Sequence, residues 1–125
     1  MTDTMGNLLI AKVHAANIHD TTAGGEVFAE AACWHPTLKG VCGDAGYRGT
    51  FEEYVDAMKL TVEIVERISK AWELLPKRWV VERTLSWLNH SRRLSKDYEI
   101  TTTSEESFVY ISHSHTLLKR LFPIS

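Results

Sequence analysis

The spacing of apolar and polar residues predicts strands and helices that alternate along most of the chain. Apolar runs of strand length occur at residues 8–13, 38–42, 60–65 and 72–75. Helical periodicity predicts helices over residues 20–34, 47–58, 76–90 and 103–121. This alternation indicates α/β layering with a mixed sheet.

A turn signal, Gly6-Asn7, precedes the first apolar run and predicts a short hairpin. The residues before Gly6 would pair with the strand at 8–13. Only five residues precede the turn, so the first arm is short. We therefore expect the parent fold to begin earlier than Met1.

Each predicted helix has one apolar face that would lie against a core. Asp20 or Thr21 is expected to cap the first helix, and Thr103 with Glu106 forms a capping box for the last. The inward residues are expected to be Val27, Phe28, Ala31 and Ala32, then Phe51, Tyr54 and Val55, and finally Phe108, Ile111, Leu118 and Leu121.

The helix that begins near Pro76 carries a carboxylate on its polar face. Its apolar stripe would consist of Val80, Val81, Thr84, Leu85 and Leu88. On a wheel of about 100° per residue, Glu82 faces away from that stripe, one turn after Arg78. The simplest interpretation is an exposed ion pair worth about 0.3–0.5 kcal/mol.

A second carboxylate, Asp44, follows a predicted buried strand in the sequence VCGDAGYRG. Gly43, Gly46 and Gly49 would let the backbone turn sharply there. Functional sites in open α/β sheets commonly form at the C-terminal ends of strands. The alternative is a turn aspartate that bonds its own backbone.

Composition fits one soluble domain of 125 residues, with 44% hydrophobic and 24% charged residues. No apolar run is long enough to cross a membrane, and the two cysteines fit a reducing cytoplasm. The net charge is −2, but a basic strip follows an acid-rich region and is compatible with a phosphate backbone. That strip contains Lys77, Arg78, Arg83, Arg92, Arg93 and Lys96.

Several motifs, in order, resemble bacterial insertion-sequence transposases of the insertion-sequence-five group, within the insertion-sequence-four superfamily of DDE enzymes. They are TDTMGNLLIAKVHAANIHD, then GDAGYRG, then LPKRWVVERTLSWLNHSRRLSKDYE. The resemblance covers nearly the whole chain. It implies DNA as substrate and a ribonuclease-H-like fold, in which three carboxylates hold two magnesium ions.

By this resemblance Asp44 matches the second catalytic Asp and Glu82 matches the catalytic Glu. Arg78 matches the Arg of the family's Tyr-Arg-Glu-Lys signature, whereas Leu75 and Asn89 replace its Tyr and Lys. Two metal ions about 3.5–4 Å apart stabilise the attacking and leaving oxygens of phosphodiester cleavage. Magnesium prefers hard oxygen ligands, which explains clustered carboxylates.

The resemblance gives no counterpart for the first catalytic Asp, since neither Asp3 nor Asp20 stands at that position. We expect residues 1–125 to be a single domain, the C-terminal part of a catalytic domain that lacks the first strand and most of the second. Unpaired sheet edges would then favour self-association. No strand cleavage by the chain alone is expected.

Other candidate residues have ordinary interpretations. Cys33, His35 and Cys42 lack a recognisable metal-ligand spacing. Trp79 and Trp87 bracket Glu82 and suit core packing better than base stacking, and the histidines suit packed or solvated roles: His14, His19, His113 and His115.

Two functions are therefore possible, beside a degenerate open reading frame with no retained role, which absence of detectable protein in cells would favour. The first is a metal-dependent DDE transposase located in the bacterial cytoplasm, which would be inactive as the 125-residue chain alone. The second is a non-catalytic DNA-binding or regulatory remnant that associates with intact transposase. Salt-dependent DNA binding without magnesium-dependent cleavage favours the second.

Overall fold

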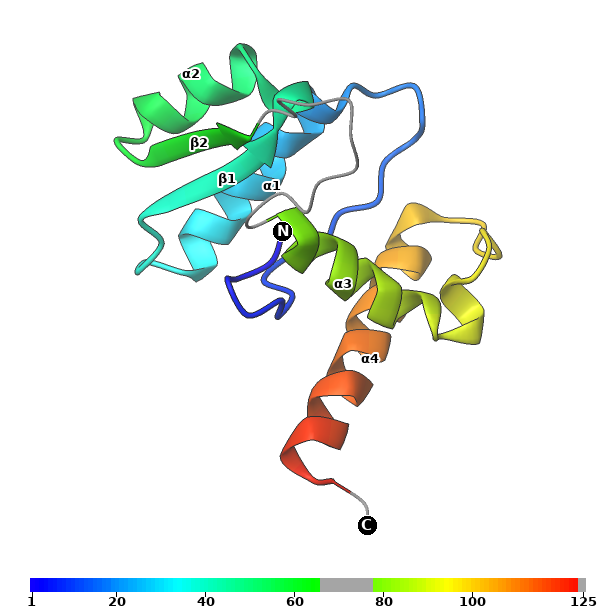
Figure 1. The fold of residues 1–125 in the computed structure, drawn as a ribbon. Helices are drawn as coiled ribbons and strands as arrows, with labels where there is room; N and C mark the ends of the chain where they lie inside the picture. The colour runs from blue at the N-terminus through cyan, green and yellow to red at the C-terminus, as the bar shows by residue number, and fades with distance from the viewer. Residues whose placement is uncertain (66–77, 124–125) are drawn as a thin grey trace, which may run out of the picture.

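A computed structural model describes residues 1–65 and 78–123, in which two parallel strands and two helices form one half of the molecule (Figure 1). Strand β1 (Gly40–Asp44) connects to β2 (Thr61–Val65) through the 3₁₀ turn η1 (Ala45–Tyr47) and helix α2 (Thr50–Ala57). Helix α1 (Asp20–Trp34) precedes them. The parallel pairing requires this crossover connection.

Among residues 1–65 and 78–123, the helices that pack on the sheet cover one of its faces. Val41 lies opposite Val62 in the register, and both pack against the core, whereas Cys42 and Glu63 lie opposite each other and are exposed. The half-buried strand predicted at 60–65 is confirmed. The buried strand predicted at 38–42 is corrected, because it begins at Gly40 and alternate side chains point away from the helices.

The core joins α1 and α2 through aromatic contacts. Phe28, Phe51 and Val55 are almost fully buried, and the Phe28 and Phe51 rings meet edge to face with centroids 5.9 Å apart. Tyr47 packs on Phe51 at 5.3 Å. Tyr54, which was predicted to face inward, is 41% exposed because it lies at the margin of this cluster.

Helix α1 begins as predicted at Asp20, but the expected side-chain cap is absent. His19 is the N-cap residue and makes no side-chain capping bond. Asp20 instead lies in the first turn, where its charge complements the helix dipole.

The N-terminal segment folds back on itself in the predicted turn. Thr2 and Leu8 form an antiparallel bridge, and Leu9 N donates to Met1 O at 3.0 Å. No continuous strand forms over residues 8–13, however. The backbone N–H groups of Leu8, Ala11 and Val13 donate to side chains instead of to a second strand.

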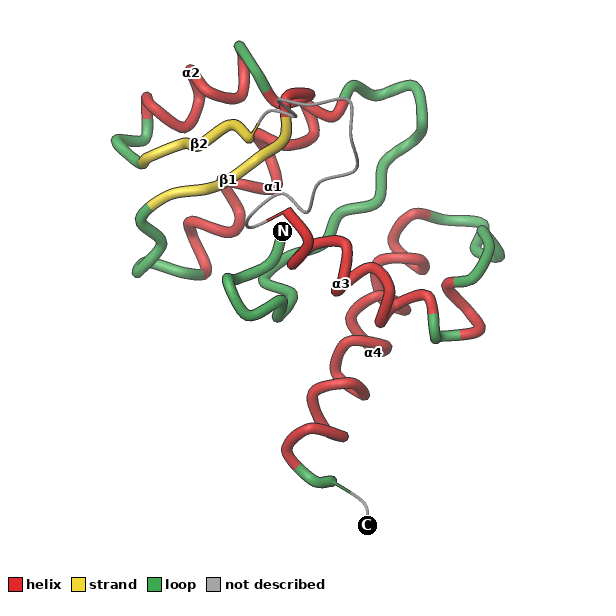
Figure 2. The backbone as a smooth tube through the Cα atoms, viewed as in Figure 1, coloured by secondary structure: helices red, strands yellow, loops and turns green. Residues whose placement is uncertain are grey.

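Those side chains belong to α4 (Thr102–Leu121), which extends away from the rest of the molecule (Figures 1 and 2). His113 Nε2 accepts from Leu8, Tyr110 Oη from Ala11, and Glu106 Oε1 from Val13. The capping box predicted at Thr103 and Glu106 is therefore wrong. Thr101 caps the helix by accepting from Ser104 N at 3.2 Å.

The apolar stripe predicted for α4 is also wrong. Ile111, Leu118 and Leu121 are exposed by 61%, 54% and 71%, and Phe108 is half-buried. The helix turns a polar face to the N-terminal segment because that segment has unpaired backbone donors. His113 is the one residue of α4 that is buried among those described.

Helix α3 (Arg78–Asn89) is followed by the 3₁₀ turn η2 (Arg92–Leu94) and then by α4. Val80, Thr84 and Leu88 are buried as predicted. Val81 and Leu85, also predicted to be buried, are 45% and 55% exposed, because the hairpin turn and α4 cover a narrower face of α3 than expected. The strand predicted at 72–75 lies outside the described residues.

No helix within residues 1–65 and 78–123 has both the length and the apolar character needed to span a membrane.

Candidate functional site

Asp44 is the last residue of β1, and its carboxylate is fixed by the loop that follows. Asp44 Oδ1 accepts from Gly46 N at 3.0 Å and caps η1. This is the turn role considered as the alternative from sequence, and it leaves Oδ2 as the oxygen that could reach an ion. The residue is half-buried at the edge where both parallel strands end.

The glycines of this loop have different roles. A Cβ on Gly46 would lie 3.1 Å from Asp44 Oδ1, so a side chain there would crowd the carboxylate. Gly49 has φ +81°, which favours glycine, and starts α2. Gly43 would make only ordinary contacts with Tyr47 if it had a side chain. Two of the three glycines thus suit the predicted sharp turn.

Tyr47 forms one wall of the loop. Burial raises the pKa of the Tyr47 phenol, and the nearby carboxylates of Asp20 and Asp44 add to the effect. The phenol therefore stays protonated near neutral pH.

Glu82 lies on the exposed face of α3, as the helical wheel predicted. Arg78 is the first residue of α3, one turn before Glu82. The side chain of Arg78 lies outside the described residues, so the predicted ion pair between the two stays a prediction. In Figure 1 the β1 and β2 arrowheads point to the right and upper right of the view, whereas α3 lies below the sheet.

The described residues contain no group of three or more His, Cys, Asp or Glu side chains that could hold a metal ion. Asp44 and Glu82 have the oxygen donors that a hard divalent cation prefers. Two carboxylates fit such an ion in chemistry, although a complete site needs further ligands. The two cysteines, Cys33 and Cys42, are exposed and belong to no such group.

Arg83, predicted to contact DNA, makes several contacts within the protein, and its DNA contact stays a prediction. Its guanidinium lies 4.4 Å from the Trp79 ring centroid and 4.9 Å from that of Trp87. Its Nη2 donates to Met5 O at 2.7 Å. Arg120 from α4 covers Trp87 at 3.9 Å. Both tryptophans thus make cation–π contacts with arginine side chains. The Trp79 side chain remains 39% exposed.

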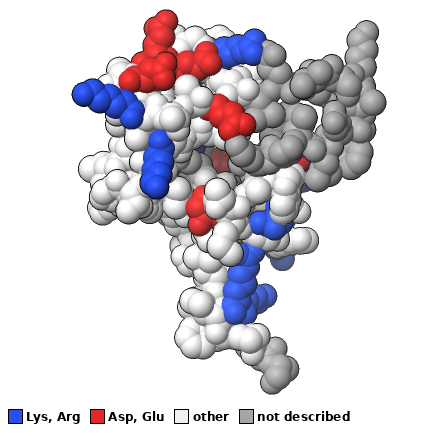
Figure 3. Space-filling view, turned by 60° about the vertical axis from the view of Figure 1, so that its left-hand side comes forward, with Lys and Arg blue, Asp and Glu red and all other residues white. Residues whose placement is uncertain are grey.

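The remaining basic residues lie around η2. Arg92 and Lys96 are exposed, whereas Arg93 bonds Glu99 and lies 4.9 Å from the Phe108 ring. Lys77 lies outside the described residues. In Figure 3 acidic side chains gather at the top, where α2 carries Glu52, Glu53 and Asp56, and basic ones occur along the projecting end of α4.

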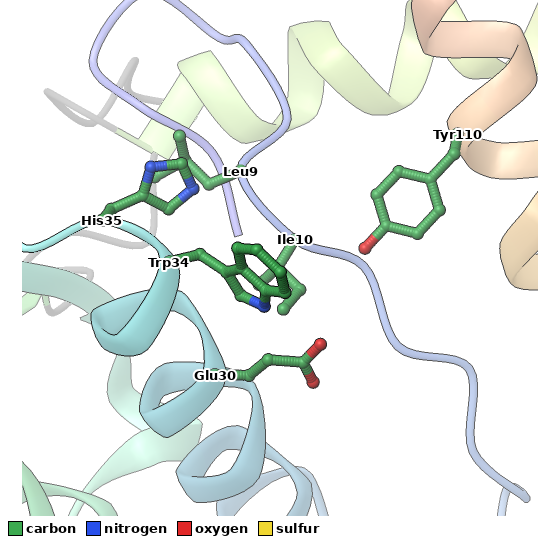
Figure 4. A pocket seen from close by; sticks show the side chains of 6 residues that line it. All are labelled: Leu9, Ile10, Glu30, Trp34, His35 and Tyr110. Atoms are coloured by element: carbon green, nitrogen blue, oxygen red, sulfur yellow. The ribbon is translucent and has the colours of Figure 1, made fainter.

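A shallow pocket of about 400 Å³ lies between α1 and the N-terminal segment (Figure 4). Two of its polar side chains already have partners within the protein. Glu30 pairs with Lys12 at 2.8 Å, and Tyr110 Oη bonds the backbone of Ala11. This pocket does not include Asp44 or Glu82.

Sequence reasoning missed two buried polar residues that connect the elements around Glu82. Thr84 was read as part of an apolar stripe, and His113 as an ordinary packed or solvated residue. Thr84 Oγ1 donates to Gly6 O at 2.7 Å, and His113 accepts from Leu8 N at 3.0 Å. A signal for Thr84 was present, because a hydroxyl on an apolar stripe needs a partner.

Comparison with known proteins identifies the family. Residues 1–117 match the family model described as a transposase DDE domain. No curated protein and no solved structure matched the chain. The family match spans Asp44, Glu82 and the elements that carry them. The chain belongs to the transposase DDE domain family, whose members act in DNA transposition and generally use divalent metal ions.

Proposed function

We propose that this chain is a transposase domain of the insertion-sequence-five type, part of a ribonuclease-H-like catalytic domain that cuts and joins DNA at the ends of a bacterial mobile element. One observation carries the proposal. In a member of the DDE family, one carboxylate ends a parallel strand and a second occupies the exposed face of α3. These are Asp44 and Glu82.

In this proposal Asp44 and Glu82 bind Mg²⁺ through carboxylate oxygens. When bound, the ions stabilise the attacking and leaving oxygens of the phosphodiester. The Gly46 N–H orients the Asp44 carboxylate so that Oδ2 is offered to the ion. Arg78, one turn before Glu82, binds a phosphate or holds the Glu82 carboxylate in place.

Basic residues around α3 and η2 would contact the DNA backbone. Arg92 and Lys96 are exposed and suit this role best; Arg93 follows Arg92 in sequence, and Lys77 directly precedes α3. Arg83 contributes mainly through its contacts with Trp79, Trp87 and Met5. Each phosphate contact that is lost should reduce the salt dependence of binding.

We further propose that residues 1–125 act as a single domain and do not cleave DNA alone. Two carboxylates are fewer than the three that the resemblance implies, and no larger group occurs among the described residues. A second copy or an intact transposase would complete the site. The alternative, a non-catalytic regulatory partner of intact transposase, draws support from the same observation and from the exposed basic residues of η2.

Ion binding and DNA binding test the proposal separately. Purified chain is titrated with Mn²⁺ and compared with Asp44→Asn, Glu82→Gln and the control Glu53→Gln, whose exposed carboxylate lies on α2. We expect the first two substitutions to weaken ion binding and the control to leave it unchanged. Equal binding by all four proteins would contradict the proposed site.

DNA binding is measured by fluorescence anisotropy over a salt series. Arg92→Gln and Lys96→Gln should each lower the salt dependence by roughly one phosphate contact. Metal-dependent nicking by the chain alone, lost in Glu82→Gln, would refute the expected inactivity but support the proposed ligands. Inhibition of an intact transposase without any ion binding would favour the regulatory alternative.

A further inference from the structure

The turn at residues 3–7 is bonded directly to α3, the helix that carries Glu82. We propose that Thr84, together with Arg83, is a positioning residue that fixes the rotation of α3 and thereby aims the Glu82 carboxylate. This inference rests on the proposed function, because it concerns the placement of a metal-binding carboxylate. It assigns a role to two residues that make no contact with the ion.

Thr84 makes a buried hydrogen bond between α3 and the turn at residues 3–7. It is only 1% exposed, and its hydroxyl lies 2.7 Å from Gly6 O and 3.0 Å from Val80 O. The single hydroxyl proton can serve one acceptor at a time, and the shorter distance favours Gly6. A buried bond of this kind is costly to leave unmade, so it holds the helix to the turn.

Arg83 adds a second attachment beside the first. Its Nη2 donates to Met5 O at 2.7 Å, and its guanidinium lies against the rings of both Trp79 and Trp87. Because Met5 and Gly6 are adjacent, two successive carbonyl groups of the turn accept bonds from two successive residues of α3. Such a pair of bonds resists rotation of the helix as well as sliding.

The Asp3 carboxylate accepts three hydrogen bonds from within the turn. Asp3 Oδ1 accepts from Met5 N and Asn7 N, both at 2.8 Å, and Asp3 Oδ2 accepts from Asn7 Nδ2 at 2.9 Å. Gly6 has φ +87°, and a Cβ there would lie 3.0 Å from Thr84 Oγ1 and 3.1 Å from Arg83 Nη2. Only a glycine permits this close approach.

The residue that follows the turn is bonded to α4. Leu8 N donates to His113 Nε2 at 3.0 Å, so the turn lies between α3 and α4 and is bonded to both. Movement of the turn would therefore disturb both helices. This arrangement makes the turn a fixed point against which α3 is oriented.

The consequence for Glu82 follows from helix geometry. Glu82 and Thr84 are two residues apart and hence about 200° apart around the helix axis. Burying Thr84 against the turn therefore directs Glu82 to the opposite, exposed face. A shift of the contact by one residue would rotate the carboxylate by about 100°.

The test compares two substitutions of Thr84. Thr84→Val keeps the shape but removes the hydroxyl, and Thr84→Ser keeps the hydroxyl. Outer residues that orient a metal ligand typically change affinity by about 10–100-fold. We expect Thr84→Val to weaken Mn²⁺ binding by about 10-fold or more, whereas Thr84→Ser should bind nearly as wild type does.

A second readout needs no metal. A nitroxide attached to Cys42 on β1, in a Cys33→Ser background, broadens amide NMR signals according to their distance from the label. We expect the broadening along α3 to change in Thr84→Val and to be unchanged in Thr84→Ser. Measurements are made well below the unfolding temperature, so that lower stability alone does not alter the pattern.

Each outcome decides a separate point. An unchanged broadening pattern in Thr84→Val would overturn the positioning role, even if the variant is less stable. Loss of Mn²⁺ binding in Thr84→Val, with rescue in Thr84→Ser, would support it. Unchanged Mn²⁺ binding in Glu82→Gln would refute Glu82 as a metal ligand. The positioning role of Thr84 would then be decided by the nitroxide broadening alone.

If Thr84→Val does not fold, Gly6→Ala provides the same test from the other side. The added Cβ would press on Thr84 Oγ1 and Arg83 Nη2. A changed broadening pattern along α3 is expected. The wild-type pattern in folded Gly6→Ala would contradict the positioning role.

Discussion

Each half of the molecule is stabilised internally by a different kind of interaction. In the half that contains β1, β2, α1 and α2, aromatic and aliphatic side chains form a continuous apolar cluster. In the half that contains the N-terminal segment, α3 and α4, side chains bond to backbone groups. The first half is built around an aromatic and aliphatic cluster, whereas the second combines a few buried apolar side chains with several side-chain-to-backbone hydrogen bonds.

This difference affects how each half should respond to substitution. Burial depends on volume and tolerates small changes in geometry, whereas a side chain bonded to the backbone requires a particular atom at a particular place. The candidate carboxylates are divided between the halves, with Asp44 in the first and Glu82 in the second. The site therefore depends on both kinds of interaction.

The largest expected effect is loss of a core aromatic ring. Phe28→Ala should lower the free energy of unfolding by about 3–5 kcal/mol, because it removes a 1%-exposed side chain and leaves a cavity. Urea unfolding measures the change. Phe122→Ala is the matched control, since Phe122 is 70% exposed and should change stability little. Equal effects of the two substitutions would refute the described core.

Two adjacent glycines of α1 give the next test. A Cβ on Gly24 would lie 2.7 Å from Tyr47 Cε1, so Gly24→Ala should destabilise by about 1–3 kcal/mol through overpacking. A Cβ on Gly25 would meet its nearest atoms at 3.9 Å, so Gly25→Ala should stabilise by about 0.8–1 kcal/mol through helix propensity. Thermal unfolding should show opposite signs, and equal signs would contradict the close contact of α1 with Tyr47.

The polar half should weaken in acid. Burial lowers the pKa of His113, and Arg120 lowers it further while Asp3 acts in the opposite direction; Arg83 also faces this turn. The unfolded chain binds the proton more readily, so His113 supports stability above about pH 6.5, and this contribution declines as the pH falls toward the folded pKa. Protonation also removes the Nε2 acceptor from Leu8 N.

Urea unfolding between pH 5 and 8 tests this dependence. His113→Gln keeps an acceptor but does not titrate, so it should flatten the decline in stability below about pH 6.5. His115→Gln is the control, because His115 is exposed on the same helix. A steeper decline in His113→Gln than in wild type would contradict the role of this histidine.

The smallest effect is expected for a surface ion pair. Lys12 and Glu30 lie 2.8 Å apart, and both side chains are 39% exposed. Glu30→Gln should lower stability by at most about 1 kcal/mol, and 0.5 M salt should reduce the difference. If Glu30→Gln lowered the free energy of unfolding as much as Phe28→Ala does, the description of this ion pair as a minor surface contact would be wrong.

The core of the first half could be predicted from sequence because its burial follows periodicity. Phe28, Ala31, Phe51 and Val55 all lie on the expected faces and are buried. The contacts of the second half could not be predicted in this way. Periodicity identifies apolar residues, but it does not show which backbone N–H groups lack a partner, and α4 turns His113 inward for that reason.

The candidate site was predictable residue by residue but not as a whole. The glycine-flanked loop located Asp44 at a strand end, and the helical wheel located Glu82 on an exposed face. How α3 is oriented depends on Thr84 and Gly6, which are 78 residues apart in the chain. Such a pairing leaves no local pattern in the sequence.

The most direct test of the shared metal site is paramagnetic broadening by Mn²⁺. A single bound ion between Asp44 and Glu82 should broaden the amide NMR signals of residues 43–46 and 81–83 at the same low Mn²⁺ concentration. Asp44→Asn should reduce the broadening in both segments together. Broadening confined to one segment, or unchanged at Glu82 in Asp44→Asn, would contradict a shared ion.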